Sequence, residues 1–114
     1  MRIVMIGAGY VGLVSGACLS QFGHEVICID KDASRVRALE AGVIPIYEPG
    51  LDEIVATSMR ANRLSFGCDM STAVRRADAV FIAVGTPARR GDGHVDLTYV
   101  FEAASEIATY LDGY

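Results

Sequence analysis

Apolar residues occur along this chain in short blocks, and the spacing within the blocks alternates between that of strands and that of helices. Residues 3–6, 25–29 and 64–66 are short apolar or alternating runs that predict strands. Residues 79–84 form a continuous apolar run, which is typical of a strand buried on both faces. The pattern therefore predicts about four strands.

Between these runs, apolar side chains recur every three or four residues, as they do on one face of a helix. The expected inward-facing residues are, in chain order, Val14, Ala17, Cys18 and Phe22; Val36 and Leu39; Leu51, Ile54, Val55 and Met59; and Val100, Ala103, Ala104, Ile107, Ala108 and Leu111. Gly23 is expected to end the first helix in a left-handed conformation. Asp32 and Asp96 are good caps for the helices that follow them, and either Asp69 or Ser71 caps a short one.

The alternation of strands and helices predicts an α/β fold with a parallel sheet and right-handed crossovers. A complete doubly wound, Rossmann-type sheet is built from two halves and has about six strands. We therefore expect a truncated Rossmann-type sheet of about four strands with flanking helices. In this interpretation residues 1–114 form one incomplete domain, and the chain is a piece of a longer protein.

The turn after the first strand reads G-A-G-Y-V-G over residues 7–12. Gly7 would allow a tight turn, Gly9 would leave room for a pyrophosphate, and Gly12 would let the next helix pack closely. The N–H groups at the start of that helix, together with the helix dipole, favour phosphate there. An ordinary strand-to-helix turn is the alternative for any one glycine, but their joint spacing after a strand and before a helix predicts a dinucleotide site.

Asp30 ends the second strand, about 20 residues beyond the glycines, where this fold places an acid that binds a ribose 2′-hydroxyl. An unpaired carboxylate at this place would repel the 2′-phosphate of NADP, so the sequence favours NAD. A solvated strand end is the alternative for Asp30. Arg35, in the first turn of the next helix, could reach the adenosine ribose or a phosphate, and a solvated arginine is equally compatible with its position.

The fourth predicted strand runs into Gly85, Thr86 and Pro87. Ligands bind at the carboxyl ends of the strands in open α/β sheets, so this segment is a candidate part of the same site. Thr86 could offer its hydroxyl and backbone N–H to a cofactor, or its hydroxyl could cap its own turn.

The composition is that of a soluble domain: of 114 residues, 52% are hydrophobic and 21% charged, with a net charge of −4. This charge provides no basic field for nucleic acid, and no run approaches the roughly 20 apolar residues of a membrane span. A cytoplasmic protein is expected. Cys18, Cys28 and Cys68 form no C-x-x-C pair and have no histidine at ligand spacing, so we expect buried or half-buried free thiols and no metal site.

Several stretches resemble the NAD-binding domain of the UDP-glucose/GDP-mannose dehydrogenase family. They are I-G-A-G-Y-V-G-L-V at 6–14, G-H-E-V at 23–26, I-Y-E-P-G-L at 46–51, F-I-A-V-G-T-P at 81–87 and D-G-H-V-D-L-T-Y-V at 92–100. Tyr47, directly before E-P-G-L, is similar to the UDP-glucose branch, whereas the GDP-mannose branch tends to have valine there.

The resemblance implies an enzyme that oxidises UDP-glucose to UDP-glucuronate, through an aldehyde and a thioester, while two NAD⁺ are reduced. The implied cofactor-binding residues are Gly7, Gly9, Val11 and Gly12 at the pyrophosphate, Asp30 and Arg35 at the adenosine ribose, Gly85, Thr86 and Pro87 towards the nicotinamide, and Tyr10 near the mouth of the active site. The family's catalytic cysteine and its lysine, asparagine and aspartate helpers would lie in a later part of the chain, and none of the three cysteines here matches that motif. The parent enzyme would be a homo-oligomer that takes a UDP-sugar.

Alternatives remain within and outside this family. A different nucleotide-sugar dehydrogenase, acting on GDP-mannose or a UDP-N-acetyl-sugar, would carry the same glycine motif. A regulatory NAD-binding module without chemistry would do so too, because these 114 residues contain no catalytic constellation. FAD-binding domains share the glycines, but the E-P-G-L and V-G-T-P stretches do not resemble flavoproteins. If the chain is part of a dehydrogenase, we expect no sugar oxidation from this segment alone, and at most weak NAD binding, because half of the cofactor cleft and the partner domain would be missing.

Overall fold

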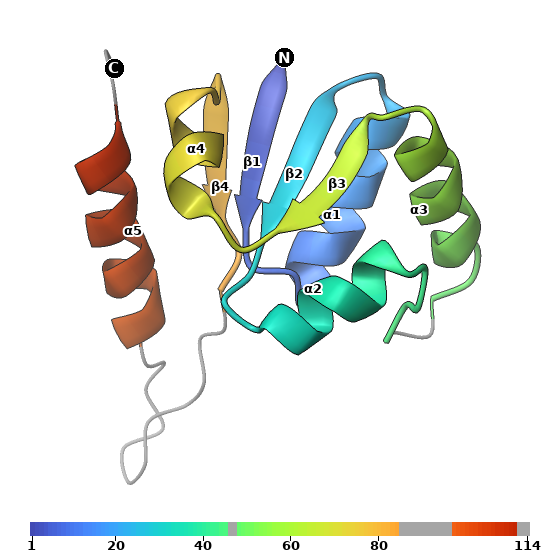
Figure 1. The fold of residues 1–114 in the computed structure, drawn as a ribbon, viewed down its shortest axis with the longest axis horizontal. Coiled ribbons are helices and arrows are strands. Elements are labelled where there is room, and N and C mark those ends of the chain that lie inside the picture. Colours follow the sequence, from blue (N-terminus) through green and yellow to red (C-terminus); the bar gives the residue numbers. More distant parts are fainter. Residues whose placement is uncertain (46–47, 85–96, 112–114) are drawn as a thin grey trace, which may run out of the picture.

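The computed structural model describes residues 1–45, 48–84 and 97–111 of the chain. The elements, in order, are β1 (Arg2–Ile6), α1 (Tyr10–Gln21), β2 (Glu25–Ile29), α2 (Ala33–Glu40), α3 (Leu51–Arg60), β3 (Leu64–Gly67), α4 (Met70–Arg75), β4 (Ala79–Ile82) and α5 (Thr98–Tyr110). The strands form one layer with helices on both sides (Figure 1).

The strands form one parallel sheet in the order β3-β2-β1-β4. β1 lies inside the sheet, where Ile3 pairs with Val26 of β2 and with Ala79 of β4. All the strands end at the same edge of the sheet, at the arrowheads in Figure 1. The expected Rossmann-type α/β fold with about four strands is thereby confirmed, and the glycine turn and Asp30 are brought to this edge.

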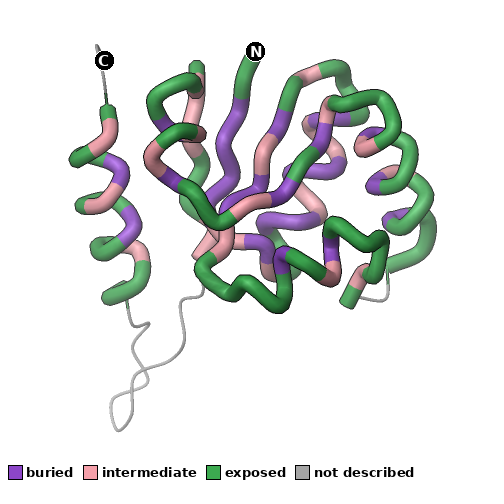
Figure 2. The backbone as a smooth tube through the Cα atoms, in the orientation of Figure 1, coloured by how far each residue is buried: buried purple, intermediate pink, exposed green. Residues whose placement is uncertain are grey.

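Alternate residues of β1 face the two sides of the sheet, and both sides are buried. Ile3 and Met5 belong to a core shared with α1, α2 and α3, whereas Val4 and Ile6 belong to a core shared with α4 and α5. Burial on both faces explains why β1 reads as a continuous apolar run. In Figure 2 the buried residues follow β1 and β2 through the middle of the molecule.

Helix α1 lies very close to β2 because Gly16 faces that strand. A Cβ at Gly16 would lie 2.8 Å from Sγ of Cys28 and 3.5 Å from Cγ1 of Val26, so no side chain fits there. The expected inward face of α1 is correct at the fully buried Ala17 but wrong at Phe22, which is 81% exposed. Phe22 is the C-cap residue, and there the chain leaves the face of the helix that packs on the sheet.

Strand β4 differs from the prediction, which placed residues 79–84 inside the sheet. Phe81 is 47% exposed and Ile82 is 39% exposed. The reason is topological: β4 pairs with β1 on one side, and in the part of the chain that the structure describes no strand pairs with its other side. The apolar run was recognised as a strand, but its burial depends on a neighbour that these residues do not supply.

Helix α5 also buries a narrower face than expected. Ala103 and Ile107 are buried against α4 and β4, whereas Ala104, Ala108 and Leu111 are exposed. The N-cap residue of α5 is Leu97, without a side-chain cap, so the helix begins later than the expected Asp96 cap implies, and Asp96 itself lies outside the described residues.

The other predicted helix ends are confirmed. Asp32 accepts hydrogen bonds from the N–H groups of Ser34 and Arg35 at the start of α2. Asp69, rather than Ser71, caps α4 in the same way. Gly23 follows α1 with a φ of 99°, the left-handed conformation that glycine adopts without strain.

Candidate functional site

The glycine turn between β1 and α1 is crowded on the side of the sheet. Gly7 has a φ of 106°, and a Cβ there would lie 2.6 Å from the carbonyl oxygen of Ala83. Its N–H donates to the carbonyl of Ile29 over 2.7 Å, which binds the turn to the end of β2. A Cβ at Gly12 would lie only 1.9 Å from the carbonyl oxygen of Gly7. Gly7 and Gly12 therefore serve the close packing of the turn, as expected.

Gly9 faces open space instead. A Cβ built there would meet no atom within 4 Å, and Gly9 is the N-cap residue of α1. The N–H groups in the first turn of a helix have no acceptor within the helix, and here no side chain caps them. Free N–H groups, the positive end of the helix dipole and open space in front of them are the features that bind a pyrophosphate. Tyr10 and Val11, which begin this helix, are both exposed.

Asp30 is held by three hydrogen bonds. Its Oδ2 accepts from the N–H of Ala8 at 2.9 Å and from Nη1 of Arg35 at 3.1 Å, and its Oδ1 accepts from the N–H of Asp32 at 2.9 Å. These bonds place the carboxylate beside the glycine turn. A carboxylate oxygen has two lone pairs, so Asp30 keeps capacity to accept a ribose hydroxyl.

The carboxylate of Asp30 is therefore not unpaired, which corrects one premise of the sequence argument. Arg35 forms an ion pair with it, so repulsion of a 2′-phosphate by this acid is weaker than we assumed. Arg35 lies beside the place expected for the adenosine ribose, and its side chain remains 42% exposed.

Tyr10 links the start of α1 to the segment before α3. Its hydroxyl donates to Oε2 of Glu48 over 2.7 Å, and this hydrogen bond, with the negative charge of Glu48, raises the pKa of Tyr10. The phenol therefore stays protonated at neutral pH. Sequence reasoning missed this contact, because nothing in the spacing of residues 38 positions apart indicates that they meet.

A cleft of about 760 Å³ opens at the carboxyl ends of β1, β2 and β4. Gly7, Gly9, Asp30 and Arg35, all expected site residues, line it. Tyr10, Val11 and Gly12 form the first turn of α1 and do not line the cleft, and Gly85, Thr86 and Pro87 lie outside the described residues.

The far wall of this cleft comes from α5, which sequence reasoning did not assign to the site. Tyr99, Glu102 and Glu106 line the cleft from that helix. Lys31, directly after Asp30, reaches across to α5, where its Nζ lies 3.8 Å from Oε2 of Glu106. These three residues are three and four positions apart, and the buried Ala103 lies beside them in the sequence. This helical spacing could have indicated that a second face of the helix lines the cleft.

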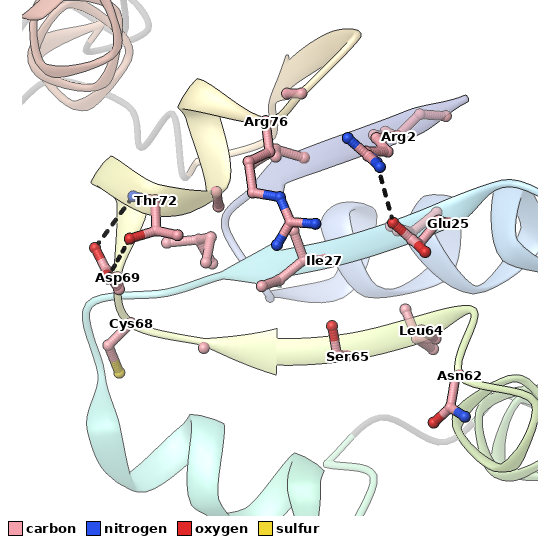
Figure 3. Close-up of a pocket in the computed structure, with 17 residues that line it drawn as sticks. Arg2, Glu25, Ile27, Asn62, Leu64, Ser65, Cys68, Asp69, Thr72 and Arg76 are labelled. Carbon is pink, nitrogen blue, oxygen red and sulfur yellow. Dashed lines mark hydrogen bonds and ion pairs between the residues drawn. The ribbon is translucent and has the colours of Figure 1, made fainter. Parts of the chain in front are cut away.

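A second hollow, of about 580 Å³, lies over β2 and β3 beside α4 (Figure 3). Arg2 and Glu25 form an ion pair at one end, with 3.6 Å between Nε and Oε2. Asp69 accepts a hydrogen bond from Thr72 at the other end, beside Cys68. None of the expected site residues lines this hollow, so the dinucleotide argument applies to the larger cleft alone.

The three cysteines lie in different environments, and none belongs to a metal-binding group among the described residues. Burial and the negative charge of Asp30 raise the pKa of Cys28 to about 12, so this thiol stays protonated. Cys18 is half-buried as expected, but Cys68 is exposed, which corrects the expectation for that residue. Over residues 1–45, 48–84 and 97–111 there is no group of metal-binding side chains, and no helix is long and apolar enough to cross a bilayer.

Comparison with known proteins identifies the family of the chain. The NAD binding domain of the UDP-glucose/GDP-mannose dehydrogenase family matches residues 1–114. UDP-glucose 6-dehydrogenase of Rhizobium meliloti is 60% identical over all of this chain, which covers 26% of that protein. UDP-glucose 6-dehydrogenase TuaD of Bacillus subtilis is 50% identical over 99% of this chain, which covers 24% of it. The chain thus spans about a quarter of the length of these relatives.

Solved structures share the fold. A GDP-mannose dehydrogenase from Pseudomonas aeruginosa matches 94% of this chain with a TM-score of 0.89 and 41% identity, and 24% of its own chain is covered. A UDP-glucose dehydrogenase from Pyrobaculum islandicum matches 93% of this chain with a TM-score of 0.87 and 42% identity, and 24% of it is covered. The expected fold, family and cofactor class are confirmed. The chain belongs to the UDP-glucose/GDP-mannose dehydrogenase family, as an NAD-binding domain.

Proposed function

We propose that this chain is the cofactor-binding part of a UDP-glucose 6-dehydrogenase, which oxidises the C6 alcohol of UDP-glucose to the carboxylate of UDP-glucuronate. Two hydrides leave C6, one in each oxidation, and reduce two NAD⁺, while water supplies the second carboxylate oxygen. The observation that carries the proposal is that a chain 60% identical to one such enzyme brings its glycine turn and Asp30 together in one cleft.

The residues of this cleft have separate tasks in the proposal. The N–H groups that follow Gly9 hold the pyrophosphate, because they are uncapped and face open space. Asp30 accepts hydrogen bonds from the adenosine ribose, and Arg35 holds the carboxylate of Asp30 in place. Tyr10, kept protonated by Glu48, presents a phenol at the start of α1, near the mouth of the active site. Thr86, between Gly85 and Pro87, contacts the cofactor towards its nicotinamide. NAD, when bound, supplies the hydride acceptor.

The catalytic cysteine belongs, in this proposal, to the longer enzyme. Cys28 is excluded as the nucleophile because it is buried and its pKa is raised to about 12. The binding surface for the UDP-sugar and the contacts of a cytoplasmic homo-oligomer are also assigned to the rest of that enzyme. We therefore expect residues 1–114 alone to oxidise no nucleotide sugar.

The test is the number of NADH molecules formed per sugar when the full-length enzyme receives limiting UDP-glucose. We expect two NADH per UDP-glucose, and the same enzyme with Asp30→Ala should need at least tenfold more NAD⁺ to reach half its rate, because a hydrogen bond to a charged group is lost. One NADH per sugar would contradict the double oxidation.

GDP-mannose is the second candidate substrate, because a GDP-mannose dehydrogenase shares this fold with a TM-score of 0.89. Running GDP-mannose beside UDP-glucose decides between the two sugars. NAD binding without NADH formation from any nucleotide sugar would favour a regulatory module instead.

A further inference from the structure

Helix α5 places an aromatic ring on the wall of the cleft that faces Asp30. Tyr99 lies in the first turn of α5, lines the cleft and is 52% exposed. Among the described residues that line this cleft, Tyr99 alone carries an aromatic ring. The other lining residues are glycines, charged residues and aliphatic residues such as Ile29 and Met70. An exposed aromatic side chain in a partly apolar cleft is suited to a planar ligand.

The site itself fixes the direction in which a dinucleotide lies. The pyrophosphate belongs at the uncapped start of α1, after Gly9, and the adenosine ribose belongs at Asp30. The base is attached to that ribose, so it lies beyond Asp30 as seen from the glycine turn. The residue there is Lys31, and its ion pair with Glu106 shows that α5 borders this end of the cleft.

Several of the charged groups at this end already have partners. Arg35 bonds to Asp30, Lys31 lies within 3.8 Å of Glu106, and Asp32 caps α2. Adenine is uncharged and planar. An aromatic ring that stacks on its face binds it better than a charged group that already has a partner.

We propose that Tyr99 binds the adenine of the cofactor by stacking its ring on the base. The inference rests on the proposed NAD site. It gives α5 a second role, because the helix would bind the cofactor in addition to packing on the sheet. Tyr99 thereby contributes affinity for the adenosine half of the cofactor and none for the nicotinamide half.

The experiment uses the chain of 114 residues, whose mass of 12.2 kDa suits solution NMR. Titrations with NAD⁺, AMP and nicotinamide mononucleotide are followed by amide shifts in the unaltered chain and in Tyr99→Ala, Tyr99→Phe and Phe101→Ala. Phe101 is the matched control, because it is an exposed aromatic residue of the same helix that does not line the cleft.

We expect Tyr99→Ala to weaken NAD⁺ and AMP roughly tenfold and to leave nicotinamide mononucleotide unchanged. Tyr99→Phe keeps the ring and should retain nearly full affinity, as should Phe101→Ala. In the unaltered chain, adenine H2 or H8 should show nuclear Overhauser effects to the ring protons of Tyr99. This last measurement needs no variant and therefore stays decisive if Tyr99→Ala folds poorly.

The outcomes separate this inference from the proposed function. If the chain binds NAD⁺ and AMP, while Tyr99→Ala binds them equally well and no effect joins adenine to Tyr99, the inference is wrong and the cofactor site stands. If Tyr99→Ala weakens nicotinamide mononucleotide as much as AMP, Tyr99 acts through the fold and the inference is again wrong. If the unaltered chain binds neither NAD⁺ nor AMP, the inference is wrong, whereas the proposed function is decided separately by the NADH count of the full-length enzyme.

Discussion

The half of the molecule built on β1, β2 and α1 is packed far more completely than the half built on β4 and α5. Leu13 and Ala17 of α1 are fully buried, and Gly16 lets that helix approach β2 until no side chain fits between them. By contrast, no residue of β4 is buried, and within α5 only Ala103 and Ile107 are buried. The cofactor cleft lies where the two halves meet.

This difference indicates which part of the site is preformed. The glycine turn and Asp30 are held by backbone hydrogen bonds and by close packing, so their geometry needs nothing from outside the first half. Tyr99 is placed by a helix that packs mainly on α4 and β4. We expect the residues at the pyrophosphate and the ribose to be rigid, and the α5 wall of the cleft, which carries Tyr99, to be more mobile.

The largest effect on folding free energy is expected at a glycine of the packed half where a Cβ has no space. Gly12→Ala would place a methyl 1.9 Å from the carbonyl oxygen of Gly7, so α1 has to move and we expect a loss of about 3 kcal/mol of folding free energy or more. Gly9→Ala is the control, because its methyl meets nothing within 4 Å. Urea unfolding should show a large drop in midpoint for Gly12→Ala and little change for Gly9→Ala, which should instead lose NAD⁺ binding. Equal midpoints would contradict the assigned packing.

The two halves can be compared directly by truncating one buried side chain in each. Leu13→Ala in α1 should cost about 3 kcal/mol, because the cavity forms in a tightly packed core. Ile107→Ala in α5 should cost about 1.5 kcal/mol, less than usual, because α5 can detach without unfolding the rest. Urea unfolding gives both values, and hydrogen exchange should show α5 amides exchanging through local opening. A larger loss for Ile107→Ala would reverse the comparison.

The ion pair at the ribose position allows a finer test within the packed half. Arg35→Ala leaves the carboxylate of Asp30 without its cation, so we expect a severalfold stronger preference for NAD⁺ over NADP⁺. Asp30→Ala should have the opposite effect on this preference and weaken NAD⁺ about tenfold. The ratio of the two dissociation constants, measured by titration calorimetry, decides. An unchanged ratio in Arg35→Ala would show that Arg35 does not influence Asp30.

The sequence predicted the elements well because each depends on local pattern. The apolar runs predicted every strand of the described sheet, and the aspartates and glycines at helix ends act as short-range signals that the structure bears out at Asp32, Asp69 and Gly23. The glycine motif and Asp30 were predictable for the same reason, since their spacing reflects one strand, turn and helix.

What could not be predicted depends on residues far apart in the sequence. The exposure of Phe81 follows from the position of β4 at the edge of the sheet. The position of a strand within a sheet cannot be predicted from the sequence of that strand alone. Lys31 meets Glu106, and Tyr10 meets Glu48, only after the sheet and helices have formed. The apolar stripe of α5 was predicted too wide because periodicity shows which residues share a face but not how much of that face is covered.

The smallest effect concerns the phenol of Tyr10, which lies at the surface of the packed half. Its pKa is raised above 10.0, first by the hydrogen bond to Glu48 and then by the charge of that residue. Because the folded-state pKa is the higher one, the stabilisation is fully present below the unfolded value near 10 and is lost as pH rises through the raised value. Glu48→Gln removes the charge, so the Tyr10 pKa should fall back towards 10, and the loss of stability that this phenol causes at high pH should become smaller.

The measurement is the pH dependence of the tyrosine Cζ resonances in ¹³C-labelled protein, with Tyr10→Phe identifying the signal. An unchanged Tyr10 titration in Glu48→Gln would mean that the contact between the glycine turn and the E-P-G-L segment does not persist in solution. In that case α1 alone would position the phenol of Tyr10, and the E-P-G-L segment would not belong to the packed half of the molecule.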